Sequence, residues 1–282
     1  MTDSSHWVLT LDCPDRPGIV HAVTGAVAAA QGNITELQQF SSDSGRFFMR
    51  LQVQTGFEQS VFAELVAPIA DRLQATWRVD HVGRPRRTLV LASKAGHCLN
   101  DLLFRQRSGL LPIRVTGVMA NHPDLGPLAA FYGVPFSHRP VTPETKEGFE
   151  REILSRLEDD DIELVVLARY MQILSPGLCE ALAGRAINIH HSFLPGFKGA
   201  NPYRQAHDRG VKIVGATAHF VTADLDEGPI IEQNVTRVDH SRDVPELVAL
   251  GQEQESRTLA EAVRLVAGHR VFLDGRRTIV FR

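Results

Sequence analysis

The sequence is poor in cysteine and contains no long hydrophobic run. Its 282 residues include three cysteines, Cys13, Cys98 and Cys179, and no C-x-x-C pair. A sparse, odd number of cysteines is typical of a reducing compartment and argues against a disulfide framework and a cysteine-based zinc site. The most apolar stretch, residues 162–168, is interrupted by Glu163 and is far too short to span a bilayer. We therefore expect no membrane contact.

A targeting signal and an excess of charge are also missing. Residues 1–6 contain neither a basic nor an apolar segment, which predicts a cytoplasmic protein without a secretory signal. The 30 Lys and Arg residues are balanced by 33 Asp and Glu residues, for a formal net charge of −3. A protein that neutralises nucleic-acid phosphates normally carries a basic surplus. We therefore expect no nucleic-acid partner.

What the sequence does contain is an ordinary globular composition, with 43% hydrophobic and 22% charged residues. A chain of this length usually forms two domains. Residues 84–87 are polar, rich in arginine and contain a proline, which favours a linker. The sequence therefore predicts one domain over residues 1–83 and a second over residues 88–282.

Hydrophobic periodicity predicts a different fold for each domain. The first has strand patterns at residues 7–11, 34–40, 47–53 and 77–82 and helical patterns at 19–31 and 62–73. This order is βαββαβ, the ferredoxin-like arrangement. The second has strand patterns at residues 88–92, 113–119, 162–168, 187–189 and 215–221, and helical patterns at 98–107, from 142 onwards and at 244–267. It predicts a Rossmann-like α/β domain with a mostly parallel sheet, in which ligands bind at the carboxyl ends of strands.

The densest group of polar residues at such a strand end begins at Asn188. Asn188 and His190 are two residues apart on an expected strand, so their side chains leave the same face. Two polar side chains there are costly unless they line a cleft or have partners. A buried, satisfied histidine beside a structural asparagine is the alternative, and this segment alone leaves both open. If the strand extends that far, His191 should point to the opposite face, and its expected role is packing or support of a neighbouring site residue.

A second candidate segment follows the strand at residues 215–221, which runs into an acidic loop containing Asp226. A histidine at one strand end and an aspartate at another are the usual parts of an oriented general acid or base. Asp226 is therefore the candidate partner of His190, with a solvated loop as the alternative. His219, near the end of this strand, is a candidate cleft residue. No H-x-x-x-H or H-E-x-x-H pattern is present, and we expect neither a metal nor a cofactor.

Two linked motifs carry a family resemblance. The N-x-H-x-S-x-L-P pattern at residues 188–195 and the H-F-V-x-x-x-L-D-x-G-P-I-I pattern at 219–231 resemble the catalytic signature of the formyltransferase fold that uses 10-formyltetrahydrofolate. The resemblance extends from about residue 88 to the C-terminus. It implies that Asn188 and protonated His190 donate hydrogen bonds to the oxyanion formed on the formyl group, and that Asp226 holds His190 and positions the nucleophile.

The resemblance also implies a folate pocket. The segment that follows the expected strand at residues 162–168 resembles the pocket loop of the family. The implied folate-binding residues are Arg169, Tyr170, Met171, Ile173, Leu174, His219 and Val221. A reduced folate is accordingly the expected small-molecule partner, as the substrate.

The acceptor of the formyl group distinguishes the members of this fold. Glycinamide ribonucleotide formyltransferases hold the phosphate of their acceptor in a glycine-rich loop, whereas residues 92–99 contain a single glycine. The whole chain instead resembles the formyltetrahydrofolate deformylases, in which water is the acceptor and formate becomes available for purine biosynthesis. The loops at residues 195–203 and 228–233 are similar to those of the deformylases. Lys198, in the first of these loops, is instead similar to the transferases, so this loop does not decide between water and another formyl acceptor.

Residues 12–19 resemble the first loop–helix junction of an ACT domain. ACT domains often bind amino acids between paired domains, so the resemblance implies an amino-acid effector and a homo-oligomer, either a dimer or a tetramer. Asp12, Asn33 and Ile34 occupy the implied effector positions. A domain that only assembles the oligomer is the alternative.

Two alternatives to a hydrolase stay open at this stage. One is a formyltransferase of the glycinamide ribonucleotide type with an unrecognised acceptor. The other is a catalytically silent sensor of folate or amino acids, against which the intact set Asn188, His190 and Asp226 argues.

Overall fold

The computed structural model describes residues 5–194 and 202–282, which form two compact units. The first unit combines residues 1–84 with residues 268–282, and the second spans residues 85–267. We expected residues 268–282 in the second domain, and this assignment is wrong. The segment at 195–201, with Lys198, lies outside the described residues.

The first unit has the expected βαββαβ order. Its elements are β1 (Ser5–Pro14), α1 (Ile19–Ala29), β2 (Asn33–Ser41), β3 (Arg46–Thr55), α2 (Gln59–Leu73) and β4 (Thr76–His81). The sheet is antiparallel in the order β2-β3-β1-β4. Leu9, Leu51 and Phe62 are among the fully buried side chains that join the sheet to its two helices.

The other face of this sheet explains why the C-terminal segment belongs to the first unit. Residues 268–282 form a hairpin of β12 (Val271–Asp274) and β13 (Arg277–Val280). Arg50 on β3 is only 3% exposed, and Nη1 donates to Glu36 at 2.9 Å. Arg270 bonds the same carboxylate at 2.9 Å, and Phe272 packs edge-to-face on Phe48 with ring centroids 5.7 Å apart. The hairpin thus covers apolar surface and shares a partly buried ion pair with the sheet.

The second unit contains a seven-stranded sheet in the order β11-β10-β9-β8-β5-β6-β7. Its strands are β5 (Arg86–Ala92), β6 (Ile113–Ala120), β7 (Phe136–His138), β8 (Leu164–Ala168), β9 (Ala186–His190), β10 (Ile213–Phe220) and β11 (Ile230–Arg237). The strands from β7 to β9 are parallel, and β10 runs antiparallel to both β9 and β11. The mostly parallel sheet is confirmed, although β5 begins within the expected linker.

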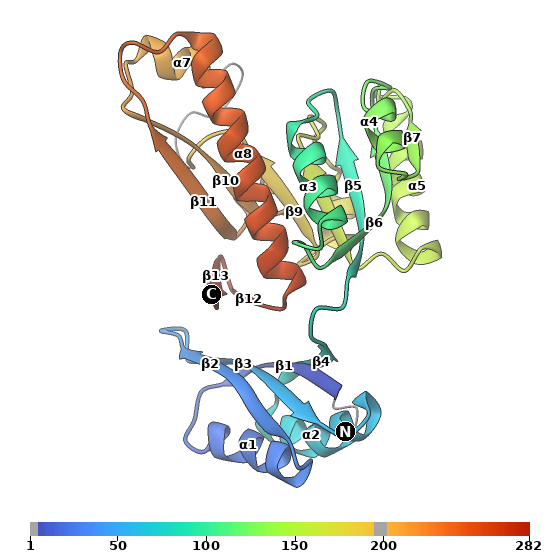
Figure 1. Cartoon of the computed structure of the whole chain (residues 1–282), viewed down its shortest axis with the longest axis vertical. Helices are drawn as coiled ribbons and strands as arrows, with labels where there is room; N and C mark the ends of the chain where they lie inside the picture. Colours follow the sequence, from blue (N-terminus) through green and yellow to red (C-terminus); the bar gives the residue numbers. More distant parts are fainter. Residues whose placement is uncertain (1–4, 195–201) are drawn as a thin grey trace. The chain divides into compact units, whose positions relative to one another are not determined.

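Helices cover both faces of this sheet (Figure 1). They are α3 (His97–Arg107), α4 (Gly126–Phe131), α5 (Lys146–Asp159), α6 (Pro176–Ala181), α7 (Pro202–Asp208) and α8 (Val244–Ala267). α3 and α8 lie side by side on one face, and α5 and α6 share a core with the other. α5 begins at Lys146 and not at Thr142, because the Thr145 hydroxyl accepts from the Thr142 N–H at 2.8 Å and closes a turn first. Among the described residues, no helix is long and apolar enough to cross a membrane.

Candidate active site

Two neighbouring strands place Asn188, His190 and His219 together. Asn188 and His190 leave the same face of β9 at its carboxyl end. Because β10 is antiparallel to β9, His219 is the residue paired with Asn188. Asn188 Nδ2 consequently lies 3.2 Å from His219 Nε2.

The loop between β10 and β11 brings Asp226 to the same place. Asp226 Oδ2 lies 3.2 Å from His190 Nδ1, and Oδ1 lies 3.7 Å from His219 Nε2. The loop turns back tightly, since a side chain at Gly228 would overlap the carbonyl oxygen of Phe220. The three residues expected to be catalytic therefore converge from two separate stretches of the chain.

The electrostatics of this group follow from its contacts. Burial by itself would raise the pKa of Asp226, but the hydrogen bond from His190 and the nearby imidazole of His219 hold that pKa well below its ordinary value. Asp226 is thus an anion that faces His190 Nδ1. The other ring nitrogen of His190, Nε2, is buried and has no hydrogen-bond partner among the described residues. It is available to donate to a bound substrate.

These residues line one cavity of about 250 Å³. All seven residues expected to bind folate line it as well, together with Asn188, His190 and Asp226. Met171 and Ile173 are 58% and 62% exposed. Ser93 Oγ accepts from the Met171 N–H at 2.9 Å, which ties this loop to the end of β5. The result is a largely apolar site with a few convergent polar groups, as is usual for small ligands.

Several lining residues were not expected from the sequence, and His191 is the most informative. Its ring stacks on that of His190, with centroids 4.8 Å apart and planes at 25°. We expected His191 on the opposite face only if the strand extended that far; β9 ends at His190 and the chain bends there, which brings both rings to the cavity. Strand alternation does not apply beyond the last strand residue. The other lining residues that were missed are Leu167, Gln172, Cys179, Ile189, Thr222, Ala223 and Leu225.

A buried carboxylate contacts Arg169, one of the residues that line the cavity. Glu255 on α8 is 1% exposed and accepts hydrogen bonds from His97 Nε2 and from the Tyr203 hydroxyl, both at 2.7 Å. Arg169 Nε lies 3.3 Å from it. Burial would raise the pKa of Glu255, but these partners outweigh burial and lower it. Glu255 is therefore ionised and anchors Arg169, which itself lines the cavity.

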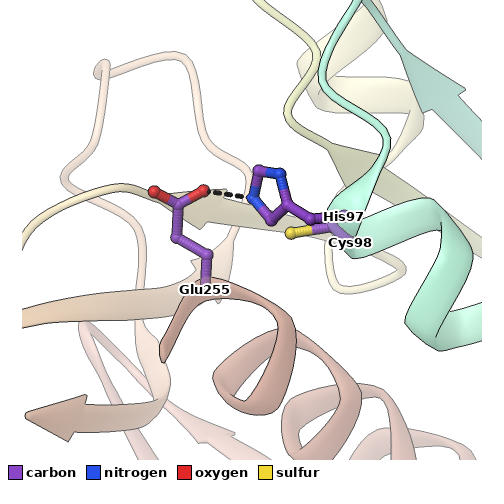
Figure 2. A group of neighbouring side chains, drawn as sticks. All are labelled: His97, Cys98 and Glu255. Carbon is purple, nitrogen blue, oxygen red and sulfur yellow. Dashed lines mark hydrogen bonds and ion pairs between the residues drawn. The ribbon is translucent and has the colours of Figure 1, made fainter. Parts of the chain in front are cut away.

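His97, Cys98 and Glu255 bring three potential metal ligands close together (Figure 2). Their ligand atoms lie within 4.8 Å of one another, and Figure 2 shows His97 turned toward the carboxylate with the thiol beside it. The Arg169 guanidinium at the same carboxylate opposes a cation, and burial raises the pKa of the Cys98 thiol, which keeps it protonated. The donor set fits a hydrogen-bonded network better than a metal centre.

The expected effector residues lie in the first unit and do not meet within one chain. Asp12 on β1 pairs with Arg46 of β3. Asn33 and Ile34 begin β2 and lie opposite the far end of β3. The positions that face Asp12 and Asn33 on β3 are Phe48 and Gln54, which places the two residues toward opposite ends of the sheet. A common effector site would need a second copy, and it stays a prediction.

Comparison with known proteins identifies both units. A formyl transferase family model matches residues 86–263, and an ACT domain model matches residues 7–59. The chain is 47% identical to the formyltetrahydrofolate deformylase of Corynebacterium sp. (strain P-1), with 100% of both chains covered. It is 37% identical to that of Escherichia coli (strain K12), with 97% of each covered.

Comparison with solved structures gives the same result as comparison with the sequences. The formyltetrahydrofolate deformylase of Burkholderia mallei matches with a TM-score of 0.95 at 50% identity, over 99% of this chain and 100% of that one. Glycinamide ribonucleotide transformylase 1 of Symbiobacterium toebii reaches a TM-score of 0.65 at 35% identity and covers 70% of this chain and 95% of its own. The protein therefore belongs to the formyltetrahydrofolate deformylase family.

Proposed function

We propose that this protein is a hydrolase that cleaves 10-formyltetrahydrofolate to tetrahydrofolate and formate. Full-length similarity to deformylases supports the reaction class. The observation that carries the proposal is the 3.2 Å contact between His190 and Asp226 beside Asn188, at the cavity lined by the residues expected to bind folate.

The contacts of Asn188 prepare it to stabilise an oxyanion. His219 Nδ1 donates to the Phe220 carbonyl at 2.8 Å, because a carbonyl oxygen can only accept. In neutral His219, Nε2 is then an acceptor, so it faces the amide nitrogen of Asn188. One amide hydrogen of Asn188 is held there, and the second is free to donate to the formyl oxygen.

His190 supplies the second donor. Asp226 accepts from Nδ1 and stabilises the imidazolium, so Nε2–H donates to the formyl oxygen as negative charge develops on it. Water adds to the formyl carbon, and the bond from that carbon to N10 then breaks. N10 receives a proton as tetrahydrofolate leaves, and formate is the other product. The proposed reaction uses no metal or cofactor.

One assay separates hydrolysis from the alternatives. The purified protein is incubated with 10-formyltetrahydrofolate alone, and formate is measured. Release at enzymic rates supports hydrolysis, whereas formyl loss only after addition of an amine acceptor supports a transferase. No loss in either case supports a sensor. The ribonucleotide transformylases match only part of this chain, which favours hydrolysis.

We further propose that the ACT domain binds an amino-acid effector in a homo-oligomer and that the protein works in the cytoplasm, where its formate feeds purine biosynthesis. The match of the ACT model supports the class of effector. Titration of free amino acids into the formate assay, with the melting temperature as second readout, tests the effector. If neither quantity changes for any amino acid, the domain serves assembly alone, which sedimentation would detect.

A further inference from the structure

We propose that His191 is a further catalytic residue, which accepts the hydrogen bond of the attacking water and takes up its proton as the C–O bond forms. This inference rests on the proposed hydrolysis of 10-formyltetrahydrofolate. It assigns the handling of the nucleophile to a residue that the set Asn188, His190 and Asp226 does not include.

The first reason is geometric. The rings of His190 and His191 are stacked with centroids 4.8 Å apart, and both line the cavity. His190 presents Nε2 to the formyl oxygen. A stacked neighbour can therefore hold a water beside the same carbonyl carbon, within reach of attack.

The second reason is that the other candidate bases are occupied. The Asp226 carboxylate already accepts from His190 Nδ1, at 3.2 Å from Oδ2, and its Oδ1 lies 3.7 Å from His219 Nε2. Glu255 is engaged by His97, Tyr203 and Arg169.

The third reason is the charge around His191. Burial, Arg169 and His190 lower the pKa of His191 to about 4, although Glu255 and Asp226 act in the opposite direction. The two stacked imidazoles thus have different surroundings, since His190 contacts the Asp226 carboxylate and His191 experiences the positive charge of Arg169. Negative charge that develops on the formyl oxygen as water attacks the formyl carbon would raise the proton affinity of His191.

The test uses a nucleophile that needs no base to activate it. His191→Phe keeps a flat ring for stacking but has no nitrogen acceptor. We expect its kcat for hydrolysis to fall about 100-fold with KM changed less than about threefold. Formyl transfer to hydroxylamine, measured as tetrahydrofolate release above the uncatalysed background, should stay within about threefold of wild type, because this amine attacks without prior deprotonation.

Controls make each outcome decisive. Asn188→Ala should lose hydrolysis and hydroxylamine transfer together, and the exposed His240→Phe should keep both. Equal loss of both reactions in His191→Phe, or undiminished hydrolysis, would overturn the proposal. If His191→Phe does not fold, His191→Gln, which keeps an acceptor, gives the same comparison with a smaller expected loss. Failure of the wild type to release formate would instead refute the proposed function.

Discussion

His219 holds the amide of Asn188 from the adjacent strand, with His219 Nε2 3.2 Å from Asn188 Nδ2. The pairing of these two residues across β9 and β10 fixes this contact, and the Phe220 carbonyl fixes the tautomer of the imidazole. His219 therefore sets the orientation of the Asn188 amide. The oxyanion donor is oriented before substrate binds.

Removal of that contact should lower the rate without removing the donor. For His219→Phe we expect kcat to fall about tenfold, because the Asn188 amide can then rotate away from the formyl oxygen. His219→Gln, which keeps an acceptor, should recover part of the rate. Steady-state kinetics measure both, and equal kcat values for the two variants would contradict the orienting role.

Removal of the donor itself should cost more. Asn188→Ala should reduce kcat by about 100- to 1,000-fold, the usual effect of losing one oxyanion donor. Asn188→Asp should be at least as slow, since a carboxylate cannot donate and repels the developing charge. Equilibrium binding of a non-hydrolysable folate analogue checks that the cavity still binds. A parallel loss of affinity would show that Asn188 serves ground-state binding.

The lowered pKa of Asp226 predicts how the stability of the fold changes with pH. Its pKa in the folded protein lies below the ordinary value of about 3.9, so its ionised form stabilises the fold above that pH. This contribution is lost as pH falls through the folded pKa. The melting temperature of Asp226→Asn should therefore lie below that of wild type near pH 6, and the difference should shrink from about pH 4 downwards. A difference that grows in acid would contradict the assigned pKa shift.

The C-terminal hairpin and the ACT sheet share Glu36, which pairs with both Arg50 and Arg270. Glu36→Gln would leave two guanidinium groups without their carboxylate, one of them on a buried side chain. We expect a loss of about 2 kcal/mol in the free energy of unfolding of this unit. Glu64→Gln, an exposed position on α2, is the matched control and should change little. Denaturant unfolding measures both, and equal stabilities would show that the ion pair contributes nothing.

The sequence predicted the fold order and the convergence of Asn188 with Asp226, because strand alternation and local motifs carry that information. It did not place the hairpin, whose strands β12 and β13 are short and follow the long helix α8. One signal was present: the run Phe47, Phe48, Met49 breaks the alternation of β3, as expected for a strand covered on both faces.

Two site residues were missed for local reasons. His191 follows the last residue of its strand, so strand alternation could not place its side chain. Glu255 lies four residues before the buried Leu259 on α8, on the face that packs into the core. A carboxylate at a core position of an amphipathic helix needs a buried partner, and this spacing could have indicated one.

Gly228 tests whether the loop that carries Asp226 depends on a close approach of the backbone. A methyl group there would overlap the Phe220 carbonyl oxygen, which also accepts the His219 hydrogen bond. Gly228→Ala should therefore displace the Asp226 loop and loosen both histidines, and we expect kcat to fall about 100-fold in a protein that still folds. Gly177→Ala, where the added methyl meets no atom within 4 Å, is the matched control. If Gly228→Ala keeps full activity, the loop can shift without moving Asp226, and its tight turn has no catalytic role.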